Sequence, residues 1–209
     1  MFHVLNRGVG QMQLFRSKRD YAAFNRVVEE TLRVVPIRMC AYCWMPNHWH
    51  FVLWPESDDD LSRFMHRMTN MHTQRWHQAK GRIGHGHLYQ GRFKSFPVES
   101  DEHFYAVVRY VERNALRAGL VQRAEDWQWG SLHQQTGNTI GLGLCDWPLP
   151  RPSDWVDYVN TPQADSELEA IQQSVRRGSP FGSSTWIKRT AGQLGLESTL
   201  RKRGRPRKE

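Results

Sequence analysis

The stretch Met45-Pro46-Asn47-His48-Trp49-His50-Phe51-Val52-Leu53-Trp54 predicts a tight turn followed by a β-strand. Pro46-Asn47 is a turn pair, and the residues after it are mostly aromatic or β-branched. Because side chains alternate between the two faces of a strand, Trp49, Phe51 and Leu53 point one way. His48 and His50 point the other way, about 6–7 Å apart along the strand, which is close enough to share one ion.

Two histidines on the otherwise apolar face of a buried strand are costly unless a ligand or a hydrogen bond satisfies them. One interpretation is a pair of hydrogen-bonded core residues. The other is a functional site, which requires partners from elsewhere in the chain.

The composition predicts one substantial core in a chain of 209 residues that is 39% hydrophobic. No apolar run approaches the roughly 20 residues of a membrane span, and no secretory leader opens the chain. We therefore expect a soluble, cytoplasmic, nucleoid-associated protein with no membrane partner. Cys40, Cys43 and Cys145 are expected to be small core residues, and Cys40 and Cys43 to point to opposite faces of a strand.

The net charge of +8 is unevenly distributed. Residues 61–123 hold eleven basic and four acidic side chains, and residues 176–209 hold ten basic and two acidic. Between them, residues 124–175 hold one basic and eight acidic side chains. Two basic blocks indicate a polyanion that is contacted at two places.

Hydrophobic periodicity places the remaining elements. The pattern predicts strands at 2–6, 37–44, 48–54 and 93–98 and helices at 17–35 and 61–78, with a glycine-rich loop at 80–91. A third helix begins after a cap at Ser100 and stops at Gly119. We place a domain boundary near 135, between a domain of residues 1–135 and a C-terminal extension of residues 136–209.

The extension is expected to hold two short helices, one opened by a Ser166-x-x-Glu169 capping box and one from Ser184 to Leu194. They could form a small DNA-binding module, helix-turn-helix at best, or an appendage packed on the core. Arg203-Gly204-Arg205-Pro206 is similar to an AT-hook core, although a basic tail that binds any phosphate is equally consistent.

The third helix carries Tyr110 and Asn114 one turn apart, on the flank of its apolar face. Arg117 falls on the same flank. Two neutral imidazoles plus an amide oxygen can hold a divalent cation with open positions for phosphate and water. A tyrosine is then a plausible nucleophile, helped by a neighbouring cation such as Arg117.

These motifs resemble the single-tyrosine HUH transposases, and within them the REP-associated tyrosine transposases. The resemblance rests on residues 2–8, 44–54, 87–95 and 109–121. It implies an α+β, ferredoxin-like fold: a small antiparallel sheet with helices packed on it. It also implies that Tyr110 is the nucleophile, and that His48, His50 and Asn114 are the metal ligands. Related transposases usually have Gln at the last position.

The family's reaction is the cleavage and joining of single-stranded DNA beside hairpin-forming palindromic repeats. It passes through a 5′-phosphotyrosine and uses Mg²⁺ or Mn²⁺, with no small-molecule cofactor. We expect a monomer or a homodimer. The expected DNA contacts are basic side chains on the second helix, the fourth strand, the tyrosine helix and the tail: Arg63, Arg67, Arg75, Arg92, Lys94, Arg117, Arg203, Arg205 and Arg207.

Three other functions fit parts of the pattern. A domesticated, non-catalytic regulator of repeat elements would keep the fold without the chemistry. A rolling-circle or relaxase-type nuclease is usually longer, and often has a third motif histidine or a second tyrosine. An RNA-binding protein would share the charge and the aromatic content.

Overall fold

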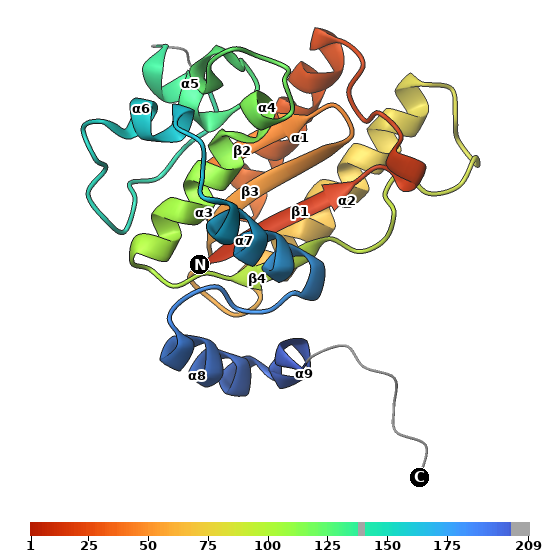
Figure 1. Ribbon diagram of the computed structural model, residues 1–209. Helices are drawn as coiled ribbons and strands as arrows, with labels where there is room; N and C mark the ends of the chain where they lie inside the picture. The colour runs from red at the N-terminus through yellow and green to blue at the C-terminus, as the bar shows by residue number, and fades with distance from the viewer. Residues whose placement is uncertain (138–140, 202–209) are drawn as a thin grey trace.

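A four-stranded antiparallel sheet forms the centre of the computed structural model, which describes residues 1–137 and 141–201 (Figure 1). Its strands lie in the order β2-β3-β1-β4. Their bounds are Phe2–Arg7 for β1, Arg38–Met45 for β2, His48–Trp54 for β3 and Lys94–Pro97 for β4. β2 and β3 form the predicted hairpin, and β4 is an edge strand, consistent with Pro97 at its end.

Helices α1 (Lys18–Val34) and α2 (Asp60–Ala79) cover one face of the sheet. Trp49, Phe51 and Leu53 are fully buried on this face, so the alternation of side chains predicted for residues 48–54 is confirmed. Ser17 begins α1 with a capping box, in which its hydroxyl accepts from the Asp20 amide. Between β1 and α1 lies a short 3₁₀ turn, η1 (Val9–Gln11).

The opposite face is covered by α3 (Glu102–Glu112), which is followed directly by the short α4 (Asn114–Arg117). The predicted cap at Ser100 was wrong by one residue. Asp101 is the cap, and its carboxylate accepts hydrogen bonds from the backbone and the ring of His103. The single predicted helix is divided at Arg113, and Gly119 ends the pair in a left-handed conformation.

A β-bulge in β2 overturns one sequence-based expectation. The pairing of β2 with β3 shifts between Met39 and Ala41, so the faces no longer alternate there. Cys40 and Cys43 consequently lie on the same face of the sheet, toward α3. Cys40 lies near the extension rather than near Cys43, since its Sγ is 3.6 Å from that of Cys145.

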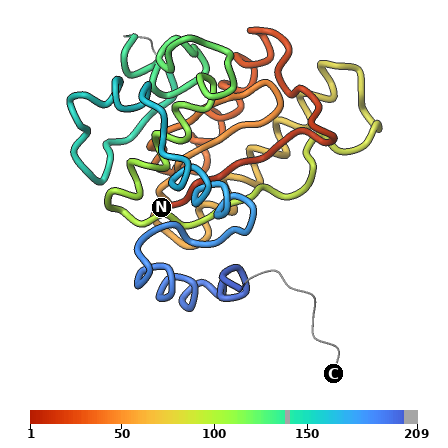
Figure 2. Tube along the Cα trace, viewed as in Figure 1, coloured from red at the N-terminus to blue at the C-terminus, as the bar shows by residue number. Residues whose placement is uncertain are grey.

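The C-terminal extension packs against α3 and the sheet. The elements η2 (Ala124–Asp126) and α5 (Ser131–Thr136) come before or at the predicted boundary. The helices of the extension are α6 (Trp155–Asn160), α7 (Asp165–Arg177), α8 (Ser184–Leu194) and α9 (Glu197–Leu200). α7 lies beside α3 and β4 (Figures 1 and 2). α7 thus fits the packed appendage, whereas α8 mainly contacts α9. The boundary near 135 stays a prediction.

Two details of the extension differ from the sequence pattern. α7 begins after Ala164, and Ser166 lies inside its first turn, so the predicted capping box was wrong. α8 has the predicted bounds and ends at Gly195 in a left-handed conformation. The AT-hook-like tail lies outside the described residues.

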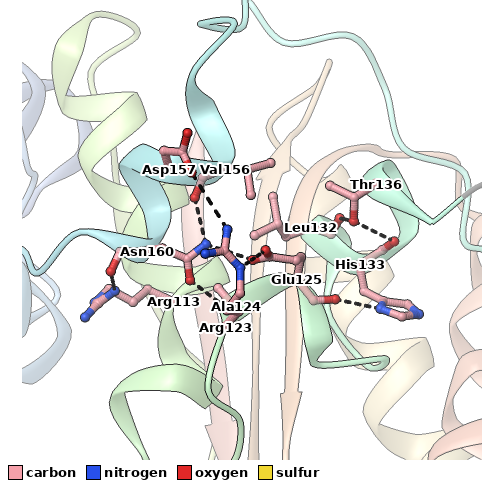
Figure 3. A network of polar contacts seen from close by, with 10 residues as sticks. All are labelled: Arg113, Arg123, Ala124, Glu125, Leu132, His133, Thr136, Val156, Asp157 and Asn160. Carbon is pink, nitrogen blue, oxygen red and sulfur yellow. Dashed lines mark hydrogen bonds and ion pairs between the residues drawn. The ribbon is translucent and has the colours of Figure 1, made fainter.

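A polar network fastens α6 to the segment that follows α4 (Figure 3). The Asn160 amide donates to Glu125 and to the Val156 carbonyl, while its oxygen accepts from the Ala124 amide. Arg113 donates to the Asn160 carbonyl at the end of α6. The extension is therefore bonded at the α3–α4 junction. Among the described residues, no helix is long and apolar enough to cross a membrane.

Candidate active site

His48 and His50 lie side by side on β3, with ring centroids 4.9 Å apart, on the face that α3 covers. In both rings the Nδ1 atom has a partner. The Nδ1 of His48 donates to the Asn47 side-chain oxygen at 2.6 Å, and that of His50 is 2.9 Å from Nε2 of His3. Within the described residues, neither Nε2 has a hydrogen-bond partner, so both remain free to bind a ligand.

The site keeps these imidazoles neutral. Burial, together with the nearby positive charges of Arg7 and Arg117, lowers the pKa of His48 to about 4. Burial also holds the pKa of His50 well below its ordinary value. A neutral imidazole offers a lone pair, which a metal ion requires.

Tyr110 of α3 packs against His50. Its ring centroid is 5.9 Å from that of His50, and the two rings meet edge to face. The Arg117 guanidinium lies over the Tyr110 ring at 4.2 Å and donates to Oδ1 of Asn114 at 3.0 Å. Tyr110, Asn114 and Arg117 therefore share one flank of the α3–α4 pair, as the helical spacing predicted.

Several buried polar atoms around the tyrosine have no partner in the described part of the chain. They are Nδ2 of Asn114, Nη1 of Arg117 and Nε of Arg7. A buried donor without an acceptor is unfavourable, and most such groups in proteins are satisfied. Three donors on two cations and an amide fit an anion with several oxygens, such as a phosphate diester.

His3 was missed by the sequence analysis. It lies on β1 opposite Val52 and is fully buried, with its ring 5.1 Å from His50 and 6.0 Å from Tyr110. Its contact with His50 depends on the pairing of β1 with β3, which joins residues 47 positions apart. The only local signal was a histidine inside a short apolar strand.

The basic side chains predicted to contact DNA have different surroundings. Arg63 and Arg67 on α2, Arg92 and Lys94 are exposed. Arg75 is also exposed, but its guanidinium forms a two-pronged ion pair with Glu30 of α1. Arg203, Arg205 and Arg207 lie outside the described residues.

A groove of about 1050 Å³ runs between α2 and the loop before β4. Its lining includes amide, imidazole, cationic and aromatic groups, among them those of Asn6, His66, Asn70, Gln90, Arg92 and Phe93. Amide edges and an aromatic face are the groups that proteins use to bind unpaired bases.

One further group of metal-ligand types occurs among the described residues. Ligand atoms of Glu99, Asp101 and His103 lie within 4.8 Å of one another, near the start of α3. Asp101 is hydrogen-bonded to His103, and Glu99 accepts from the Ser183 amide. This group contains none of the predicted ligands, and it shares no residue with the site around Tyr110.

The sequence and the fold were compared with known proteins. The family model described as "Transposase IS200 like" matches residues 1–114. A Haemophilus influenzae protein named as a REP-associated tyrosine transposase is 23% identical over 140 residues, covering 63% of this chain and 74% of that protein.

A solved structure of a REP-associated tyrosine transposase bound to a REP hairpin matches the fold. Its TM-score is 0.53 at 20% identity, and the match covers 72% of this chain and 90% of that one. The predicted α+β fold and the resemblance seen in the sequence are both confirmed. Since the family model spans more than half of its length, the chain belongs to the IS200-like transposase family.

Proposed function

We propose that this protein is a metal-dependent endonuclease and strand transferase for single-stranded DNA, acting beside hairpin-forming palindromic repeats. The observation that carries the proposal is the placement of Tyr110 against His50, which lies beside His48 on β3, and under the Arg117 guanidinium. A nucleophile, ligands for a cation and a phosphate-binding charge are thus adjacent on one face of the sheet.

In the proposed reaction the Tyr110 oxygen attacks the scissile phosphorus. The new bond joins Tyr110 to the 5′ side of the break, while the bond from phosphorus to the 3′ oxygen is broken. The phenol loses its proton, and the departing 3′ oxygen gains one to become a hydroxyl. Because the phosphodiester energy is kept in the phosphotyrosine, a 3′-hydroxyl can reverse the step and join strands.

The donor set fits a divalent cation, Mg²⁺ or Mn²⁺. His48 and His50 would bind it through their Nε2 atoms, since both Nδ1 atoms have partners. Asn114 would be the third ligand. Its Oδ1 already accepts from Arg117, and a carbonyl oxygen retains a second lone pair for a metal. A bound cation would polarise a non-bridging oxygen of the scissile phosphate.

Arg117 is proposed to hold the phosphate beside Tyr110. Its Nη1 is buried and has no partner among the described residues, although another of its nitrogens donates to Asn114. Arg7, opposite His48 in the pairing of β1 with β3, supplies a second positive charge. Arg117, which lies over the Tyr110 ring, is placed to offset the negative charge that increases as the phenol attacks.

The proposed substrate is a hairpin with a single-stranded flank. The structurally similar transposase is bound to a REP hairpin. Here the exposed Arg63, Arg67, Arg92 and Lys94 offer contacts to phosphates, and the groove beside α2 has room for unpaired bases. Arg75 and the basic tail remain proposed DNA contacts.

A covalent-adduct assay tests the function. Hairpin-flanked oligonucleotides from the source genome are incubated with the protein and Mn²⁺ and separated on a denaturing gel. We expect a slow, protease-sensitive band that disappears with a chelator and in Tyr110→Phe. Tyr105→Phe is the matched control: it removes a hydroxyl on the same helix that donates to the Pro150 carbonyl, and it should retain the band.

The same assay separates the alternatives. Binding across a panel of hairpins with no adduct from any of them would contradict the proposal and favour a non-catalytic regulator. Adducts formed equally well on RNA oligonucleotides of the same sequence would contradict the choice of DNA.

A further inference from the structure

His3 occupies a position where the fold does not require a polar side chain. It is fully buried on the α3 face of β1, and its ring packs 4.8 Å from Phe96. Leu5 and Val52, its neighbours on this face, are apolar. Its Nδ1 has no partner among the described residues, which is an unfavourable arrangement for a core histidine.

Among the described residues, the one polar contact of the His3 side chain is with a proposed metal ligand. Its Nε2 lies 2.9 Å from Nδ1 of His50. A neutral imidazole carries its proton on one nitrogen, and the hydrogen bond made by one nitrogen decides which lone pair the other offers. For His50 to offer Nε2, its proton must reside on Nδ1, and that proton needs an acceptor.

His48 shows the same arrangement with a different acceptor. Its Nδ1 faces the side-chain oxygen of Asn47, which can only accept. His48 and His50 therefore both direct Nδ1 away from the proposed metal site. The Nδ1 of His48 faces the Asn47 amide oxygen, and that of His50 faces His3. A neutral His3 ring that carries its proton on Nδ1 can accept at Nε2.

We propose that His3 is a positioning residue for His50: it accepts the Nδ1 proton, fixes the tautomer whose Nε2 binds the metal, and holds the plane of the ring. This role rests on the proposed function. It is independent of the roles of Asn114 and Arg117, which approach the site from α4. The contact of His3 with Tyr110, at 6.0 Å and nearly perpendicular, further restricts the tyrosine ring.

Mn²⁺ affinity tests the role without cleavage. Binding is measured by calorimetry and by the electron paramagnetic resonance signal of free Mn²⁺, in a Tyr110→Phe background that cannot react. His3→Leu removes the acceptor, and we expect affinity to fall about 10–100-fold, the usual effect of losing such a partner. His3→Gln places a carboxamide oxygen near the former Nε2 position and should recover most of the loss.

The matched control is His72→Leu. His72 is also a buried histidine, hydrogen-bonded through its Nδ1 to Tyr89, but it lies on the other face of the sheet. We expect this change to lower thermal stability and to leave Mn²⁺ affinity unchanged. His3→Leu with unchanged Mn²⁺ affinity, or His3→Gln as weak as His3→Leu, would overturn the role of His3.

Two further results keep the outcomes distinct. If Mn²⁺ binding in the parent protein does not depend on His48 and His50, the proposed function itself fails. If His3→Leu does not fold, nitrogen-15 spectra of the Mg²⁺-loaded parent decide the matter. They should show the proton of His50 on Nδ1, and a proton on its Nε2 would overturn the proposal.

Discussion

Replacement of Arg117 by methionine should separate catalysis from stability. The change removes the hydrogen bond to Asn114 and the contact with the Tyr110 ring. A hydrogen bond from a charged donor contributes about 1.5–3 kcal/mol, and a cation over an aromatic ring about 0.5–2 kcal/mol. The change also has a stabilising effect. The Arg117 guanidinium is partly buried and has one unsatisfied nitrogen, so its removal avoids a desolvation cost of several kcal/mol in the folded state.

The opposing terms nearly cancel, so we expect the unfolding free energy of Arg117→Met to stay within about 1 kcal/mol of the parent value. For a chain of this size that corresponds to about 2–4 °C in melting temperature. Cleavage should nevertheless fall about 10²–10³-fold, the usual effect of removing one donor to transition-state charge. The measurements are thermal denaturation and single-turnover formation of the covalent adduct.

Arg113→Met is the matched control, one turn earlier. Arg113 donates to the carbonyls of Val159 and Asn160, so its contacts are structural. We expect it to lose stability, by about 1–3 kcal/mol, and to keep its rate of adduct formation per folded molecule. An Arg117→Met protein that cleaves at the parent rate, or whose lost activity follows its lost stability, would refute the reasoning.

Three more outcomes are expected. Burial raises the pKa of the Glu112 carboxyl above 4.5, although Ser131 and Trp155 donate hydrogen bonds to it. The protonated Glu112 side chain therefore stabilises the fold fully below pH 4.5, and this stabilisation is lost as the pH rises. Glu112→Gln should therefore gain stability relative to the parent between pH 4 and 8 in urea titrations, and a constant difference would contradict this. Diamide should oxidise Cys40 and Cys145 to a disulfide, because their sulfurs are 3.6 Å apart, leaving one thiol to titrate after denaturation. Three thiols in the parent, or a Cys145→Ser protein that also loses its two remaining thiols to diamide, would contradict that pairing. Lys94→Gln should lower the salt-dependence slope of single-strand binding by about 0.7, and an unchanged slope would place Lys94 off the DNA.

The sequence predicted those parts of the fold that depend on local patterns. Alternation along residues 48–54 was sufficient to assign Trp49 and His50 to opposite faces, since one face is packed against two helices. Capping chemistry was less certain. Ser100 and Asp101 are both good caps, and only the hydrogen bond to His103 shows which one begins α3.

The remaining features depend on contacts between distant residues. The bulge that turns Cys40 toward α3 comes from the pairing of β2 with β3, and His3 meets His50 through the register of β1 against β3. The acidic stretch after Gly137 lacked periodicity, so α6 was not predicted. Its position depends on the Asn160 network and on Trp155, which packs under α3 and donates to Glu112.

The hydrogen bonds that hold the extension on the domain also limit which helices two copies of this chain could exchange in a domain swap. Arg109 and Arg113 of the tyrosine helix donate to four carbonyls between Val159 and Pro162. The same extension is hydrogen-bonded to the sheet. The backbone amide of Cys145 donates to the Met39 carbonyl, and that of Phe181 donates to the Pro97 carbonyl. A swap of α3 alone would break the first set, and a swap of everything after β4 would require the second set to form between the two chains. In this structure Tyr110 lies against His50 of its own chain, so we expect one copy to be able to carry out both halves of the reaction by itself.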